Sequence, residues 1–349
     1  MLDEKVALEI GWDCYSFGIP LIKKRFLDEE YALLFKGYQA ARLRHVKISG
    51  FDRFSKKYIL LRLNAWRRGR SFDSSIKPDF IRKIDVQYCP ITTEKLTHST
   101  GLTSDWSVDR INNDAGYSPG NLVIVSALAN MAKDRYTYNE IRHFALDKDA
   151  ILPGPVDQMR ALTKPEWMRW ASICSLVVIN SEGRSRLEFD VVPCVARLPK
   201  NLPMNGSAGL QVAIGLFVSR ISTAPLTAAL AALPKKKRRE LREVLSRAEK
   251  VADAGPAVHE IWFHERLFNE FSAFYLSLSE SEEDAIYFAL TRAFCSKESF
   301  SICVEDWAIE NAGYVNKKEV SVPLADEGLI EGEMFAESVS DECFDLLAA

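Results

Sequence analysis

The first 84 residues carry hydrophobic side chains at helical spacing. In residues 29–44 and 54–68, apolar positions recur three and four residues apart, with polar and basic positions between them. Gly50 and Gly69 follow these segments and favour turns there. The pattern therefore predicts a helical N-terminal segment over residues 1–84.

A different pattern occupies residues 85–150. Residues 106–111 and 122–125 have the composition of short strands, and a turn-rich stretch at 112–120 joins them. Ser126 is a good N-cap for a helix over Ala127–Lys133. The order strand, loop, strand, helix predicts a small ββα module.

The rest of the chain is predicted to be helix-rich. A helix over Tyr138–Leu146 is followed by a Pro- and Gly-rich linker at 152–155. Helical periodicity runs through residues 210–294, where Pro225 and Pro234 are placed as helix-starting residues. Two non-helical features are also expected, a β-hairpin of residues 167–180 and 186–195 around 181–183, and a loop at 199–209.

The predicted fold class is therefore α+β and mainly helical. We expect four parts along the chain: a basic helical segment (1–84), the ββα module (85–150), a mainly helical C-terminal domain (151–325) and an acidic tail (326–349).

Charge is distributed unevenly along the chain. The formal net charge is −3, but residues 36–83 hold 14 basic and 3 acidic residues, a net +11. Residues 301–349 hold 2 basic and 12 acidic residues, a net −10. The small net charge is thus the sum of a basic segment suited to polyanions and an acidic C-terminal segment. The acidic segment either folds over the basic face or only aids solubility.

Aromatic residues interleave with the basic ones before residue 84. Tyr58, Trp66 and Phe72 alternate with four arginines, which are the candidate nucleic-acid contacts: Arg62, Arg67, Arg68 and Arg70. This composition is typical of a phosphate-binding face, although it also suits a solvated surface over core aromatics. A second basic run, at residues 235–239, is followed by Glu240 and Glu243. The favoured interpretation of this run is a solvated helix face, and the next is a phosphate contact.

Cysteine usage and hydropathy exclude several classes of protein. The seven cysteines are scattered without any C-x-x-C pair, so neither a disulfide framework nor structural zinc is expected. The first residues lack a secretory signal pattern, and no apolar run is long enough to span a bilayer. A cytoplasmic location without a membrane partner is therefore expected.

Two oxygen-bearing side chains lie on the predicted ββα elements. Asp109 falls on the first strand and Asn130 on the helix, so both could reach one hard cation such as Mg²⁺ or Mn²⁺. Such an ion suits phosphodiester cleavage. Lys133 lies one helical turn beyond Asn130, where it could meet phosphate. In isolation these residues would more often serve as caps or hydrogen-bond braces.

The sequence motifs of this segment resemble those of a known family. Four groups occur in order, namely Ser107-Val-Asp-Arg-Ile-Asn112, Gly116-Tyr117, Gly120-Asn121-Leu122 and Asn130-Met-Ala-Lys133. In this order and spacing they resemble the HNH endonuclease family, also called ββα-metal or His-Me finger, and its phage- and bacteria-associated branch. The resemblance covers about 45 of the 349 residues, from Cys89 onward.

The resemblance implies roles for individual residues. Asp109 and Asn130 would hold the metal, and Asn121 would pin the loop to the first strand. Arg110 stands where the family has its general base, a histidine, and arginine cannot accept a proton at physiological pH. Either His98, the one histidine within residues 89–134, replaces it, or Arg110 clamps the scissile phosphate. Cys89 stands at the family's zinc position, but the other cysteines that would bind zinc with it are absent from the sequence.

Three functions follow from these observations. The first is a metal-dependent endonuclease that cleaves DNA, with RNA not excluded, in a bacterial or phage-infected cell and a phage, mobile-element or defence context. The second is an HNH-like DNA-binding or regulatory protein with weak or lost cleavage, because of Arg110. The third makes the C-terminal helical domain the working part, binding a protein partner or a second copy of the chain.

Overall fold

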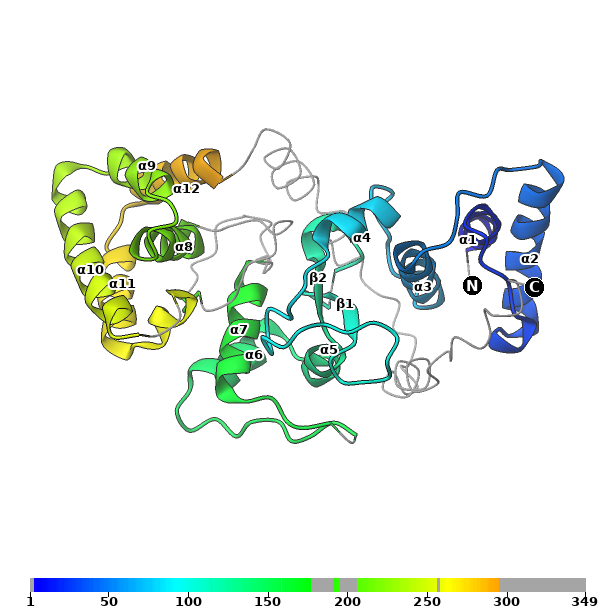
Figure 1. The fold of residues 1–349 in the computed structure, drawn as a ribbon, viewed down its shortest axis with the longest axis horizontal. Helices are drawn as coiled ribbons and strands as arrows, with labels where there is room; N and C mark the ends of the chain where they lie inside the picture. The colour runs from blue at the N-terminus through cyan, green and yellow to red at the C-terminus, as the bar shows by residue number, and fades with distance from the viewer. Residues whose placement is uncertain are drawn as a thin grey trace.

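Helices make up most of the chain that the structure describes, and its two strands form one small antiparallel sheet (Figure 1). This computed structural model describes residues 3–113, 115–157, 159–176, 191–194, 206–255 and 258–294. The acidic tail expected at 326–349 lies outside these residues. The mainly helical α+β class predicted from the sequence is confirmed at this level.

The N-terminal half contains seven α-helices and the sheet among the described residues. Their bounds are α1 Glu4–Ser16, α2 Asp28–Leu43, α3 Arg53–Arg67, α4 Pro78–Ile84, β1 Trp106–Arg110, β2 Leu122–Ser126, α5 Ala127–Lys133, α6 Tyr138–Leu146 and α7 Lys164–Ser175. In the sheet, Trp106 pairs with Ser126 and Arg110 with Leu122, with no residue inserted between. Side chains therefore alternate regularly along β1.

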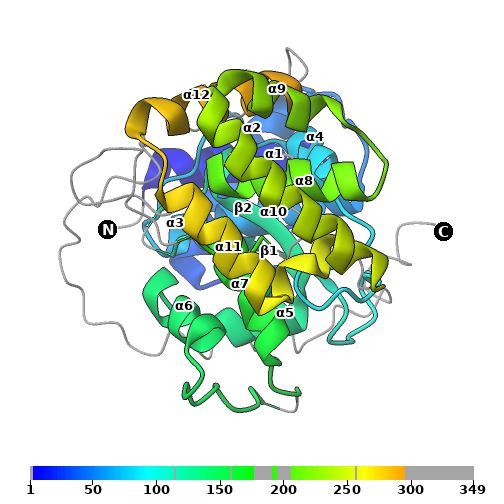
Figure 2. The ribbon, with the colours of Figure 1, turned by 90° about the vertical axis from the view of Figure 1, so that its left-hand side faces the viewer.

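The C-terminal half adds five α-helices within the described residues. They are α8 Gly206–Val218, α9 Ala224–Ala232, α10 Lys235–Asp253, α11 Glu265–Leu276 and α12 Glu280–Phe294, with a 3₁₀ turn, η3, at Val258–Phe263 before α11. Figure 2, in which these helices face the viewer, shows α10 and α11 crossing the front of the molecule side by side. No described helix is both long and apolar enough to cross a bilayer.

Local capping explains why several elements begin where the sequence predicts. The Asp52 carboxylate accepts hydrogen bonds from the Phe54 and Ser55 amides and starts α3. The Ser126 hydroxyl accepts from the Ala129 amide and starts α5. Pro225 lies in the first turn of α9, and Pro234 is the N-cap of α10.

The β-hairpin expected from residue 167 is wrong over the part that the structure describes. Residues 167–175 belong to helix α7, which begins with a capping box between Thr163 and Glu166 and has a proline in its first turn. Its buried positions include Trp167, Trp170 and Cys174, which follow helical spacing. The loop expected at 199–209 is also corrected, since α8 starts at Gly206; residues 177–190 and 195–205 lie outside the described part.

Two hydrophobic cores divide the described residues. The first runs from α1 through the sheet to α7, and the second joins α8 to α12. The basic N-terminal helices and the ββα module therefore share one hydrophobic core, to which α7 also contributes. Arg169 of α7 links the two parts: one guanidinium nitrogen donates to the Ile91 carbonyl at 2.9 Å, and the other pairs with Glu260 at 3.0 Å.

Helices α1 and α2 pack closely through two glycines. A Cβ at Gly37 would collide with the backbone carbonyl of Leu8, and one at Gly11 with that of Leu34. Backbone carbonyls within a helix cannot move aside as flexible side chains can. Both glycines are therefore required by the approach of the two helices.

We expect Gly37→Ala to destabilise the protein. Alanine in a helix interior usually stabilises by about 0.5–1 kcal/mol relative to glycine, but overpacking against backbone costs about 1–3 kcal/mol and should win. Urea unfolding measures the difference, with Gly154→Ala as the control because that site has open space. Equal or higher stability of Gly37→Ala would contradict the close packing.

Candidate functional site

The candidate site lies between strand β1 and helix α5. On the side of β1 that faces α5, the Ser107 hydroxyl accepts a hydrogen bond of 2.9 Å from the Asn130 side-chain amide. Two residues on, an Asp109 carboxylate oxygen lies 2.9 Å from the Lys133 ammonium. Asp109, Asn130 and Lys133, which sequence reasoning selected, are thus brought together on one face.

Lys133 is the most enclosed charged residue of the site. Its side chain is 0 % exposed, and its ammonium also donates to the Arg110 carbonyl at 2.9 Å and to the Asn113 side-chain oxygen at 3.2 Å. The Trp170 ring of α7 lies 5.5 Å from the same nitrogen. The phosphate contact that the sequence suggested for Lys133 stays a prediction, and it would require the buried ammonium to leave these partners.

The loop between the strands is held by Asn121, which is fully buried. Its side-chain oxygen accepts from the Asn112 amide at 2.8 Å, and its nitrogen donates to the carbonyls of Asn112 and Gly116 at 3.0 and 2.9 Å. These bonds tie the loop to the end of β1. They are the contacts that the resemblance implies for this residue.

The Gly116-Tyr117 pair docks the same loop on the N-terminal segment. The Tyr117 amide donates to the Ser71 carbonyl, and the Tyr117 carbonyl accepts from the Asp73 amide, both at 2.9 Å. A Cβ at Gly116 would collide with Ser71. The close approach of the two segments explains why residue 116 is glycine.

Arg110 points to the loop and not to the α5 face. Its guanidinium donates to the carbonyls of Asn113 and Ala115, each at 3.0 Å, and lies 5.2 Å from the Tyr117 ring. Since β1 has no inserted residue, Arg110 and Asp109 lie on opposite faces of the strand. In this structure Arg110 braces the loop, and the clamp on phosphate that the sequence suggested would require it to leave these carbonyls.

His98 lies on the other face of the sheet, among residues of α3. Its ring packs edge-on against Trp106 and contacts the Arg53 guanidinium, which also pairs with Asp85 at 2.6 Å. Partial burial and the neighbouring charge of Arg53 lower the His98 pKa below its usual value. A low pKa would suit a base, but Trp106 and Asp109 are on opposite faces of the strand, so the structure does not bring His98 to Asp109. The role of His98 as the base stays a prediction.

Two of the candidate phosphate-binding arginines are used inside the N-terminal helices. Arg62, with an 11 % exposed side chain, pairs with Asp13 and Glu9 of α1 at 2.5 and 2.9 Å. Arg67, 22 % exposed, pairs with Glu30 of α2 through two nitrogens at 2.8 and 3.0 Å. Carboxylates that precede the basic window therefore neutralise both arginines, which does not favour their contact with nucleic acid. Arg68 and Arg70 are half-buried, and all four contacts stay predictions.

Cys89 holds a tight turn against the start of α5. Its sulfur accepts hydrogen bonds from the Ile91 and Thr92 amides at 3.4 Å each and from the Ser126 amide at 3.2 Å. Ser126 is the last residue of β2 and the N-cap of α5. The thiol therefore links the turn that begins at residue 89 to the helix that carries Asn130 and Lys133.

The donor set at this face suits a hard cation. Asp109 offers a carboxylate that is 13 % exposed, and the hydrogen bond from the Asn130 nitrogen to Ser107 leaves its amide oxygen as the free end of that side chain for a ligand. Mg²⁺ is commonly bound by one or two protein oxygens with water completing the shell. The described residues contain no group of three or more His, Cys, Asp or Glu arranged for a metal, so only such a sparse site fits.

Several supporting residues were missed at the sequence level. Asn113 and the Arg110 carbonyl complete the surroundings of the Lys133 ammonium, and Trp170 donates from its indole nitrogen to the Ala129 carbonyl at 3.2 Å while covering α5. Trp170 is 37 residues beyond Lys133 and lies on a helix that the sequence pattern had suggested as a strand. No local signal could have placed it here.

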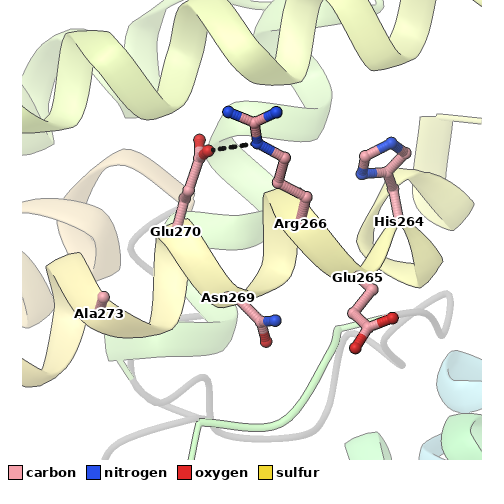
Figure 3. A pocket seen from close by; sticks show the side chains of 6 residues that line it. All are labelled: His264, Glu265, Arg266, Asn269, Glu270 and Ala273. Atoms are coloured by element: carbon pink, nitrogen blue, oxygen red, sulfur yellow. Dashed lines mark hydrogen bonds and ion pairs between the residues drawn. The ribbon is translucent and has the colours of Figure 1, made fainter.

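A shallow hollow of about 620 Å³ lies beside α11, away from these residues (Figure 3). Its lining residues are His264, Glu265, Arg266, Asn269, Glu270 and Ala273. Glu270 is paired with Arg266 and with Arg247, at 3.1 and 3.0 Å, and these arginines lower its pKa. The hollow holds none of the residues that sequence reasoning selected.

Comparison of the chain with protein-family models, with curated proteins and with solved structures found no match.

We expect Asn121→Ala to be strongly destabilising. It removes three hydrogen bonds of a buried side chain, one from the Asn112 amide and two to the carbonyls of Asn112 and Gly116. At about 1 kcal/mol per bond, the loss is about 3 kcal/mol. Denaturant unfolding measures the loss, with the exposed Asn139→Ala as the control. A change below about 1 kcal/mol would show that the loop does not depend on Asn121.

Proposed function

We propose that the chain is a metal-dependent endonuclease of the HNH type that cleaves phosphodiester bonds in DNA. The observation that supports the proposal is that Asp109 of β1 and Asn130 of α5 both lie where these two rigid elements contact each other, Asp109 beside Lys133 and Asn130 beside Ser107. Sites built on strands and helices hold ligands more precisely than sites on loops. The sequence resemblance supplies the reaction class.

The division of labour follows from the contacts. Asp109 and Asn130 would hold Mg²⁺ or Mn²⁺, which when bound polarises the phosphoryl oxygen and stabilises the leaving oxygen. Asn121, Gly116 and Tyr117 fix the loop that closes the site, and Ser107 orients the Asn130 amide. Arg110 holds loop carbonyls and His98 lies on the other face, so neither provides a base from its present position. A missing general base costs about 10²–10⁴-fold, which predicts slow cleavage.

A second candidate function is a DNA-binding protein on the same scaffold that does not cleave. Two observations favour it: the Lys133 ammonium is already paired with Asp109, and Arg110 occupies the position of the expected base. Both candidates require contact with nucleic acid. Binding of a protein partner through the C-terminal helices remains a further prediction.

A group of exposed cations that would suit phosphate lies on α10. Lys235, Lys236, Arg239 and Arg242 are all exposed in the first two turns of α10 and form no ion pair within the described residues, whereas Lys237 pairs with Glu240. Cations at a helix N-terminus oppose the helix dipole. This arrangement costs helix stability in the free protein and favours a bound anion, as the second interpretation of this run expected.

We expect purified protein to nick supercoiled plasmid slowly with Mg²⁺ or Mn²⁺. Asp109→Asn and Asn130→Ala should each lower the rate by about 10²-fold or more, since the ion contributes several kcal/mol to the barrier. Asp149→Asn, an exposed carboxylate, is the control. Nicking that persists in Asn130→Ala and Asp109→Asn would exclude this site, and DNA binding without any nicking would favour the second candidate.

DNA affinity should fall steeply with salt and depend on α10. Changing Lys235, Lys236, Arg239 and Arg242 to Gln should flatten the dependence of log K on log[salt] by about 3 to 4, the value for four phosphate contacts. The matched control removes the same charge from the exposed residues Lys5, Lys24, Lys47 and Lys83. An equal loss in the control would place the contact in the N-terminal half, and unchanged affinity in both would argue against phosphate binding.

A further inference from the structure

The Lys133 ammonium lies in a cage of oxygens that would suit a metal ion. The cage consists of the Asp109 carboxylate at 2.9 Å, the Arg110 carbonyl at 2.9 Å and the Asn113 amide oxygen at 3.2 Å. A carboxylate with carbonyl and amide oxygens is the ligand type that hard divalent cations take. The cage thus already holds one cation, supplied by the chain.

The enclosure makes this cation part of the fold. The Lys133 side chain has no exposure, so its charge must be compensated inside the protein, and Asp109 provides the compensating charge. A divalent ion that approached Asp109 would meet a fixed positive charge on the same carboxylate. Repulsion between the two cations is strong in a partly buried site, where water screens little.

We propose that Lys133 is the resident cation of this site, and that a divalent ion binds Asp109 only by displacing its ammonium. The inference rests on the proposed function in that it concerns the same carboxylate. Lys133 is then a gating residue, which sets how readily the site takes metal.

The displacement needs only a small movement. A lysine side chain has a flexible four-carbon stem, and two of the three oxygens around the nitrogen do not come from Asp109. Asn113 is held in place, because its nitrogen donates to the Asp134 carbonyl at 2.7 Å. The ammonium can therefore release Asp109 while keeping the Arg110 carbonyl and the Asn113 oxygen.

Metal binding by variants tests the inference without any cleavage assay. Mn²⁺ binding to the full-length protein is measured by calorimetry for the wild type and for Lys133→Met, whose unbranched side chain is one atom shorter and carries no charge. We expect Lys133→Met to bind Mn²⁺ at least about 10-fold more tightly, because the competing cation is gone. Adding Asp109→Asn should abolish that gain.

The wild-type protein provides a second measurement in case Lys133→Met does not fold. Reaction of lysines with an amine-specific reagent is followed by mass spectrometry, with the 83 % exposed Lys148 as the internal reference. Without metal, Lys133 should be almost unreactive. Saturating Mn²⁺ should raise the labelling rate of Lys133 several-fold relative to Lys148. Buffer of equal ionic strength without divalent ions should not.

The outcomes separate this inference from the proposed function. If Mn²⁺ binds the wild type through Asp109 with unchanged affinity in Lys133→Met, and Lys133 labelling stays constant, the gate is overturned and the hydrolytic site survives. If only Lys133→Met binds Mn²⁺ through Asp109, the gate is supported and metal-dependent cleavage by the wild type fails. If neither protein binds Mn²⁺, both proposals are overturned.

Discussion

The ion pair between the buried Lys133 ammonium and Asp109 is the interaction on which the rest of the ββα module depends. A charge with no solvent exposure is tolerated only with a counter-charge and further hydrogen bonds. Here these come from the Asp109 carboxylate and the Arg110 carbonyl of β1 and from the Asn113 side chain of the following loop. The same requirement draws α5 onto β1 and places Trp170 of α7 over the ammonium. The geometry of the candidate site is therefore a consequence of how this one charge is satisfied.

Local features of the fold could be predicted from the sequence because their causes are local. The caps Asp52 and Ser126 lie within three residues of the amides that they accept from, and apolar spacing marks α3 and α5. Helix α7 was missed since its apolar residues run directly into a β-branched stretch, and the capping box of Thr163 and Glu166 is a weaker signal than that composition. The shared core of the N-terminal helices and the module has no local signature.

The site was predictable in part, and the reason is distance along the chain. Asp109, Asn130 and Asn121 stand in fixed spacing within one short segment, so the pattern could select them. The partners that neutralise the arginines lie far away: Asp13 is 49 residues before Arg62, and Glu30 is 37 before Arg67. Charge counted in a sequence window therefore overstated the basic surface of the N-terminal helices. Strand alternation, in contrast, places neighbouring residues such as Asp109 and Arg110 on opposite faces unless a bulge intervenes, and the register of β1 with β2 has none.

Anomalous diffraction from wild-type crystals soaked in Mn²⁺ tests the central claim most directly. The account predicts an ion bound to Asp109 and Asn130, with the Lys133 nitrogen withdrawn from the carboxylate and still bonded to the Arg110 carbonyl. An ion bound to Asp109 with the Lys133 ammonium unmoved from the same carboxylate would contradict it.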